Sequence, residues 1–97
     1  MPPPSKLKLP REVADLIRSL YPQVKRKIRS AVDEILKMPA SGKQLRGELV
    51  GYRSFRVGRI RIIYREKDEI IEIVTIGRRE VVYFETALLL RRTSPKA

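Results

Sequence analysis

The stretch that most constrains the fold runs from Gly51 to Tyr83, where three runs rich in Ile, Val, Tyr and Phe follow one another. A Gly-Arg pair at 58–59 separates the first two runs, and the acidic segment 66–69 separates the second from the third. Short runs of β-branched and aromatic residues divided by turn residues are typical of consecutive β-strands. The stretch therefore predicts a meander of three antiparallel strands.

The turn between the first two runs predicts how their strands pair. Gly58 stands at the first central position of a two-residue loop, where a type II′ hairpin requires a positive φ angle. With Gly58 and the next residue as the loop, Val57 pairs with Ile60. Arg56 then lies directly opposite Arg61. The core-facing side is predicted to carry Phe55, Val57, Ile60, Ile62 and Tyr64, and the other side Tyr52, Ser54, Arg56, Arg61, Ile63 and Arg65.

The first two runs hold an excess of arginine that a sheet does not require. Two like charges directly opposite each other destabilise a sheet. An anion lying between Arg56 and Arg61 would remove the repulsion; otherwise both guanidinium groups extend into water. The excess indicates an anionic partner outside the sheet. The five arginines, which no acid accompanies within these two runs, are Arg53, Arg56, Arg59, Arg61 and Arg65.

The overall charge supports the same expectation. The chain carries 22 Lys and Arg against 11 Asp and Glu, a net charge of +11, which predicts a polyanionic or acidic protein partner. The absence of Cys and His excludes disulfides, thiolate zinc sites, a Cys nucleophile and the usual general base. We expect no metal and no cofactor. The longest apolar runs, 81–84 and 87–90, are too short to span a membrane, so we expect a soluble, cytoplasmic protein without a membrane partner.

Two amphipathic helices are predicted between a short N-terminal strand and the meander. Residues 6–9 alternate between polar and apolar, as a strand does. Apolar residues then recur at helical spacing, first over 13–20 and again over 24–35. Tyr21-Pro22 separates the two runs, because the residue before a proline avoids helical φ and ψ. The basic run 25–27 on the second helix is either a solvated face or a contact for nucleic acid.

These elements define a fold of the α+β class in the order β-α-α-β-β-β-α. We expect an antiparallel sheet, formed by the N-terminal strand and the three-stranded meander, packed on the helical hairpin. Residues 84–92 have the composition of a short C-terminal helix. The whole chain, 1–97, is predicted to be one domain with loose tails at 1–5 and 93–97.

Four segments carry a resemblance to a known family. Residues 45–53 read Leu-Arg-Gly-Glu-Leu-Val-Gly-Tyr-Arg, and an Arg-Val-Gly triplet follows at 56–58. Residues 61–64 read Arg-Ile-Ile-Tyr, and residues 77–83 read Gly-Arg-Arg-Glu-Val-Val-Tyr. In this order the segments resemble the RelE/ParE toxin superfamily over nearly the whole chain. The resemblance implies a RelE-like fold, a type II toxin, and a protein antitoxin with which the toxin forms a hetero-oligomer.

The RelE-like branch implies a ribosome-dependent endoribonuclease, an mRNA interferase that cuts by attack of a ribose 2′-OH on the adjacent phosphodiester. Arg61 and Arg79 stand where RelE-like enzymes place two phosphate-binding arginines. Tyr83 stands where the family carries a tyrosine that stacks on or orients the scissile nucleotide. Arg53 and Arg56 complete the candidate catalytic set, at positions where RelE itself uses lysines. RNA contacts are predicted for Lys43, Arg46, Tyr52, Arg59, Arg65 and Arg78.

The residue types leave the general base open. An arginine keeps its proton, so Arg53 and Arg56 can stabilise charge but are poor bases. The chain has no His. The base is then Lys43, Glu48 or Tyr83, or else the arginines act by electrostatics alone.

Two other functions are compatible with the resemblance. A ParE-like inhibitor of DNA gyrase would need no nuclease residues. Toxins of that branch tend to close the last strand with a His-containing segment, whereas this chain keeps Arg79 and Tyr83 there, which favours the nuclease. A catalytically inactive member that binds nucleic acid or antitoxin would use the positive charge alone.

Overall fold

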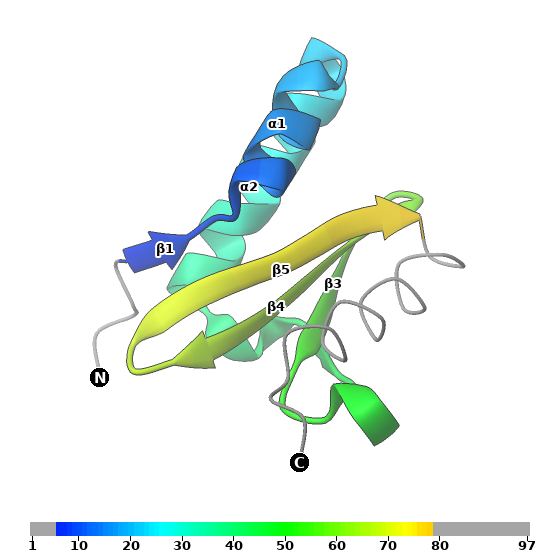
Figure 1. Ribbon diagram of the computed structural model, residues 1–97. Coiled ribbons are helices and arrows are strands. Elements are labelled where there is room, and N and C mark those ends of the chain that lie inside the picture. Colours follow the sequence, from blue (N-terminus) through cyan, green and yellow to red (C-terminus); the bar gives the residue numbers. More distant parts are fainter. Residues whose placement is uncertain (1–5, 79–97) are drawn as a thin grey trace.

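The computed structural model describes residues 6–78 and shows a sheet with two helices on one face (Figure 1). The expected tails at 1–5 and 93–97, the expected helix at 84–92, and the site residues Arg79 and Tyr83 lie outside the described residues. In chain order the elements are β1 (Lys6–Lys8), α1 (Arg11–Ser19), α2 (Pro22–Lys37), a 3-10 turn (Pro39–Ser41), β2 (Lys43–Gln44), a second 3-10 turn (Gly47–Leu49), β3 (Arg53–Val57), β4 (Ile60–Lys67) and β5 (Ile70–Arg78).

The sheet has the strand order β1-β5-β4-β3-β2 and is antiparallel except at one edge. Strand β1 pairs with β5 in parallel, with Lys6 opposite Ile70, so the expectation of an antiparallel sheet is wrong for this pair. An alternating pattern predicts a strand but not its direction, and helices α1 and α2 supply part of the long connection that a parallel pair requires. Strand β2 was not expected; its two residues pair with the first two residues of β3.

The β3–β4 hairpin has the predicted register. Val57 pairs with Ile60 and Arg56 lies opposite Arg61. Gly58 has a φ of +61°, as the first central position of a type II′ turn requires, and no positive φ occurs at Arg59. The turn residues therefore determine which side chains share a face.

The pairing of β4 with β5 contains a bulge that the sequence did not reveal. Ile63 lies opposite Thr75 whereas Tyr64 lies opposite Ile73, so Val74 is an extra residue on β5. An extra residue reverses which faces the following side chains occupy. The bulge lets Ile73 share the core side with Tyr64 and places Glu72 on the opposite side.

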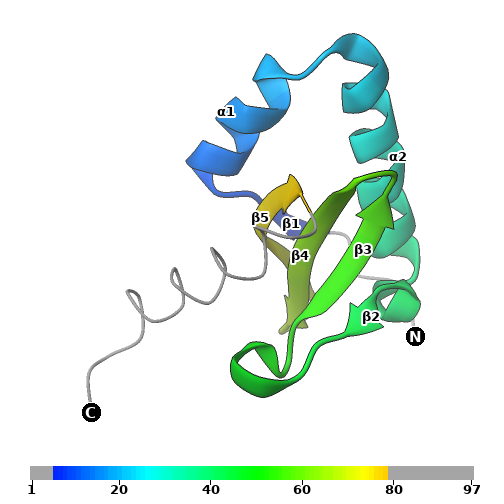
Figure 2. The same cartoon turned by 90° about the vertical axis from the view of Figure 1, so that its right-hand side faces the viewer.

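The core lies between the sheet and the two helices. Ile62 and Tyr64 are fully buried, and the other predicted core-facing residues of the hairpin are partly buried against them. Ile28 and Ile35 of α2 pack into the same cluster, with α2 in contact with β3 and α1 in contact with β5. Figures 1 and 2 show that the tip of the helical hairpin projects beyond the sheet. No described helix is both long and apolar enough to cross a bilayer.

Candidate nucleic-acid interface

Arg56 and Arg61 form the centre of the candidate site. They lie directly opposite each other on β3 and β4, on the face away from the helices. Side chains at such a pair start from Cα atoms only about 4.5–5.5 Å apart. Arg56 is exposed and Arg61 half-buried, and neither forms an ion pair with a described residue. The Nε of Arg56 donates a hydrogen bond to the carbonyl oxygen of Gly58 at 3.1 Å.

The partner of Arg61 on β5 is Gly77, which adds no side chain to this face. Two guanidinium groups with compatible donor geometry can bind the oxygens of one phosphate. The arrangement is therefore a candidate site for a phosphate-like anion, with positive charge on both sides of it.

Arg65 lies on the same face but is neutralised. Its Nε donates to Oε1 of Glu72 at 2.6 Å, and the Nζ of Lys8 lies 3.3 Å from Oε2 of that carboxylate. Burial opposes ionisation of Glu72, yet the hydrogen bonds from Arg65 and Lys8 lower its pKa below the usual value. The Arg65 guanidinium also lies over the Tyr52 ring, 5.3 Å from its centroid. Arg65 and Tyr52 thus form a structural cluster at the end of the face remote from the β3–β4 turn.

Arg53 lies on the core-facing side, next to Tyr64, and not with Arg56 and Arg61. Its Nη1 donates to the carbonyl oxygens of Gly42 at 2.8 Å and Ala40 at 3.4 Å. The Tyr64 hydroxyl donates to the carbonyl oxygen of Pro39 at 2.6 Å and accepts from the N–H of Gly42 at 2.9 Å. Burial raises the pKa of this phenol. Arg53 and Tyr64 therefore hold the connector between α2 and β3 against the sheet.

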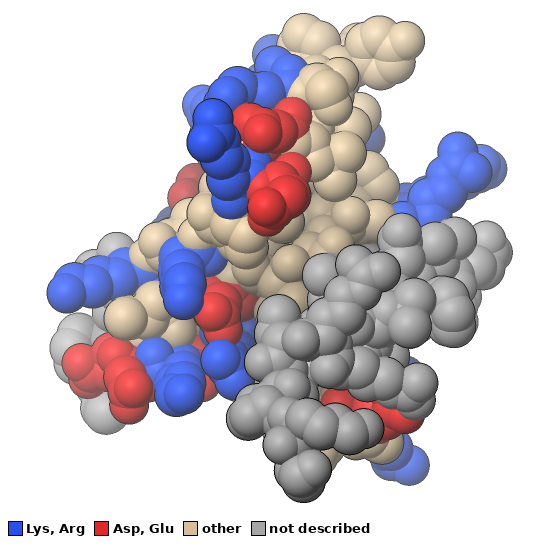
Figure 3. Space-filling model, viewed as in Figure 1, with Lys and Arg blue, Asp and Glu red and all other residues tan. Residues whose placement is uncertain are grey.

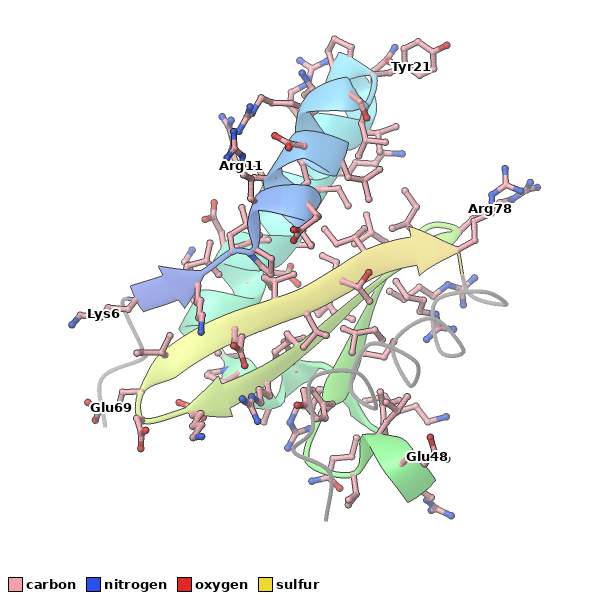
Figure 4. The ribbon with its side chains drawn as sticks, viewed as in Figure 1. Lys6, Arg11, Tyr21, Glu48, Glu69 and Arg78 are labelled. Atoms are coloured by element: carbon pink, nitrogen blue, oxygen red, sulfur yellow. The ribbon has the colours of Figure 1, made fainter. Side chains whose placement is uncertain are left out.

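The other predicted site residues are spread around this centre. Lys43 pairs with Ser54 and so lies on the same face as Arg56, exposed. Arg59 is exposed in the β3–β4 turn. Arg78 pairs with Ile60 on the core-facing side and projects beyond the end of β5 (Figure 4). Arg46 and Glu48 are exposed in the loop before β3.

The surface around the sheet varies in charge from one end to the other. Figure 3 shows acidic and basic side chains interleaved near β1 and the β4–β5 turn, whereas the cation at the end of β5, Arg78 in Figure 4, stands apart. Within residues 6–78 there is no group of three or more His, Cys, Asp or Glu side chains placed to hold a metal ion.

A groove between α2 and β3 was missed as a site by sequence reasoning. Its volume is about 340 Å³. The only sequence signal for it was the basic run at 25–27, which was compatible with either a solvated helix face or a contact for nucleic acid. The groove is lined by Arg26, Lys27, Ser30, Ala31, Glu34, Phe55, Arg56 and Val57.

The sequence of this chain matches a known protein family over most of its length. The model of a family described as the ParE toxin of the type II toxin–antitoxin system parDE matches residues 8–83. The chain belongs to the RelE/ParE superfamily of type II toxins. This confirms the resemblance seen in the sequence. No curated protein sequence matches the toxin.

Solved structures of RelE toxins share the fold of this toxin. The Mycobacterium tuberculosis toxin–antitoxin complex RelBE2 contains a chain 26% identical, with a TM-score of 0.70, covering 81% of this chain and 94% of that one. Free Escherichia coli RelE, solved as an arginine double mutant, is 19% identical with a TM-score of 0.73, covering 97% and 100%. A chain of the Pyrococcus horikoshii RelE–RelB complex is 21% identical with a TM-score of 0.64, covering 78% and 96%.

Proposed function

We propose that this toxin is an endoribonuclease that cuts mRNA on the ribosome. The observation that carries the proposal is the pair Arg56 and Arg61, two cations that face each other without an acid between them. Two like charges at this position lower the stability of the sheet, so their presence indicates that the pair serves a function. A phosphodiester bound between the two side chains relieves the repulsion. The two guanidinium groups then lie where negative charge develops on the phosphorane.

The proposed reaction needs no group beyond the chain and the RNA. The 2′-oxygen attacks the adjacent phosphorus, the bond from phosphorus to the 5′-oxygen breaks, and a 2′,3′-cyclic phosphate remains. One proton leaves the 2′-OH and one reaches the departing 5′-oxygen. Arg56 and Arg61 stabilise the phosphorane oxygens, a contribution of about 10²–10³-fold for one well-placed donor.

We also propose roles for the residues around the phosphate, including the group that accepts the proton of the 2′-OH. Among the described residues, Lys43 is the base candidate that lies on the same face as Arg56. Arg79 and Tyr83 keep their proposed roles as the second phosphate-binding arginine and the nucleotide-orienting tyrosine. The positions of Arg53 and Arg65 favour structural roles for these two residues.

The proposed partners follow from charge and from the relatives. Related toxins from M. tuberculosis and P. horikoshii were solved in complex with antitoxins, which supports a cognate antitoxin for this chain. A net charge of +11 suits an acidic segment that folds on binding. With ribosomes and mRNA as its proposed targets, the toxin would act in the cytoplasm.

Expression of the toxin alone tests the proposal. Transcript 5′ ends are mapped a few minutes after induction, in parallel with Arg61→Ala and with Arg11→Ala as a control on exposed α1. We expect cuts within translated codons for the parent and the control, and none for Arg61→Ala. Cuts that persist in Arg61→Ala would remove this residue from the mechanism.

Inhibition of DNA gyrase is the second candidate, because the matching family model describes ParE toxins. Such an inhibitor needs no reactive groups, only a binding surface. The same expression experiment separates the two candidates: growth arrest with intact transcripts and double-strand DNA breaks favours the gyrase inhibitor.

A further inference from the structure

Apart from Arg56, the groove between α2 and β3 is lined by residues that the proposed cleavage chemistry does not use. Its floor is apolar, with Phe55, Val57 and Ala31 as lining residues. Its polar lining residues are three cations, one carboxylate and one hydroxyl: Arg26, Lys27, Glu34 and Ser30 of α2, and Arg56 at the edge of β3, whose side chain belongs to the opposite face of the sheet. No described residue forms an ion pair with any of these three cations. The groove is therefore a basic surface with an aromatic floor.

Helix geometry explains why only part of the basic run reaches the groove. Arg26 and Ser30 are four residues apart, as are Lys27 and Ala31, so both pairs line one side of α2. The core-facing side carries Ile28, which is buried. Lys25 and Arg29 fall on the side away from the groove and do not line it. The same helix thus provides two pairs of cations, one inside the groove and one outside it.

The edge of β3 beside the groove is open. Strand β2 pairs only with Arg53 and Ser54. The residues that flank a two-residue hairpin loop form a hydrogen-bonded pair, and such pairs alternate along the strands. Val57 is therefore bonded to β4, whereas the N–H of Arg56 points outward to the open edge. This N–H adds a backbone donor beside the Arg56 side chain.

We propose that this groove binds one nucleotide of single-stranded RNA, adjacent to the phosphate held between Arg56 and Arg61. The base stacks on Phe55, and the nucleotide's phosphate lies between Arg26 and Lys27. A volume of about 340 Å³ is in the range of small-ligand sites. The inference rests on the proposed function, because the same RNA strand occupies both sites.

Arg56 is what favours RNA over an acidic peptide. It lines the groove at the edge of β3 and lies opposite Arg61 on the neighbouring face, so the groove and the proposed phosphate site meet at this one residue. A strand with a phosphate at every nucleotide can occupy both sites at once. Aromatic stacking and backbone charge are the two means by which proteins bind single strands without reading sequence.

Binding of a short RNA tests the groove directly. The probe is a fluorescein-labelled 2′-O-methyl hexanucleotide, which lacks the nucleophile and stays intact, and its affinity is measured by anisotropy at several salt concentrations. Arg26→Gln/Lys27→Gln is compared with Lys25→Gln/Arg29→Gln, which removes the same charge from the other side of α2. We expect the groove variant to lose at least about fivefold in affinity, with a salt slope smaller by about 1.4. The control variant should stay within about twofold of the parent.

Equal losses in the two double variants would overturn the inference, since the effect would then be general charge. Unchanged affinity in both, or no measurable binding by the parent, would overturn it as well. Transcript cleavage in cells is measured separately. If transcripts are still cleaved and the two double variants bind RNA equally well, the groove does not bind RNA, and the proposed nuclease activity is unaffected. A groove variant that binds RNA normally but loses its antitoxin would identify a protein-binding surface instead.

Stacking on Phe55 has its own test. Phe55→Leu keeps an apolar floor but removes the ring, and we expect about a fivefold or greater loss of affinity for the same probe. If this variant fails to fold, the parent is cross-linked to a hexanucleotide carrying 5-iodouridine and the adduct is located by mass spectrometry. Adducts on residues 55–57 or 26–31 support the groove, and adducts confined to other residues contradict it.

Discussion

Four arginines on strands β3 and β4 occupy two different situations. At the end near the β3–β4 turn, Arg56 and Arg61 face each other without an acid. At the other end, Arg53 donates to two carbonyl oxygens and Arg65 to a carboxylate. The residue type is the same throughout. What separates the two pairs is the set of acceptors that the rest of the fold brings to each.

The two acceptor sets have different origins. Glu72 reaches Arg65 because the bulge at Val74 turns it to that face. The carbonyl oxygens reach Arg53 because the connector after α2 is held against the sheet by Tyr64. Neither device operates near the β3–β4 turn. The difference teaches that an arginine is available to a ligand where the fold brings no acid and no distant carbonyl group to it; Arg56 donates to the carbonyl oxygen of Gly58 within its own turn.

The largest expected effect separates activity from stability at the turn end. Arg56→Ala should reduce transcript cleavage by about a hundredfold, because a phosphorane loses one fixed donor. The free energy of unfolding should stay unchanged or rise slightly, because the repulsion from Arg61 disappears. Cleavage in purified ribosome extracts and urea unfolding measure the two quantities. A clear loss of stability would mean that Arg56 has a structural partner.

The next effect concerns the anchor at the other end. Gly42→Ala should destabilise the toxin by about 1–3 kcal/mol, because overpacking forces Tyr64 to move. A Cβ at this position would lie 2.5 Å from the Tyr64 hydroxyl oxygen. Urea unfolding of Gly42→Ala, Tyr64→Phe and the double variant tests this coupling. The double variant should cost less than the sum of the single ones; strict additivity would show that the close approach is unimportant.

A smaller effect is expected for the ion pair of Arg65 and Glu72. The two side chains are 32% and 22% exposed, so solvent screens part of their attraction. Glu72→Gln should cost about 0.5–1 kcal/mol in the free energy of unfolding and leave transcript cleavage within about twofold. Chemical denaturation and 5′-end mapping provide the two readouts. A loss of cleavage as large as that of Arg56→Ala would mean that the ion pair of Arg65 and Glu72 also takes part in cleavage.

The smallest effect is the acid dependence of that ion pair. The pKa of Glu72 is lowered in the folded toxin, so the folded state binds fewer protons than the unfolded chain between the two pKa values. The contribution is present above the unfolded glutamate pKa of about 4.3. It is lost as the pH falls through the lowered pKa. The difference in unfolding free energy between the parent and Glu72→Gln should shrink over this window; a constant difference would exclude the linkage.

Much of the hairpin could be predicted from the sequence. Gly58 and the alternation around it predicted the Arg56 and Arg61 pair, and the structure confirms it. The helical spacing of apolar residues predicted both helices, which begin and end near Pro10, Pro22 and Pro39. These signals are local, because a turn or a helical face depends on residues only a few positions apart.

The residues that sequence reasoning placed differently depend on distant partners. Arg53 was expected in the catalytic set, yet its acceptors lie 11 and 13 positions away in the chain. Arg65 was expected to bind RNA, but a bulge that the alternation does not reveal brings Glu72 beside it. The parallel pairing of β1 likewise depends on how the helices cross the sheet.

By itself, the sequence determined the α+β class, the two helices, the hairpin register and the excess of positive charge. It also contained the motifs that identify the family. Only the tertiary structure decided which arginines remain available to a ligand and that Arg26 and Lys27 share a groove with Arg56. The physical reason is that propensity and periodicity act along the chain, whereas the neutralisation of a charge depends on acceptors brought close through space.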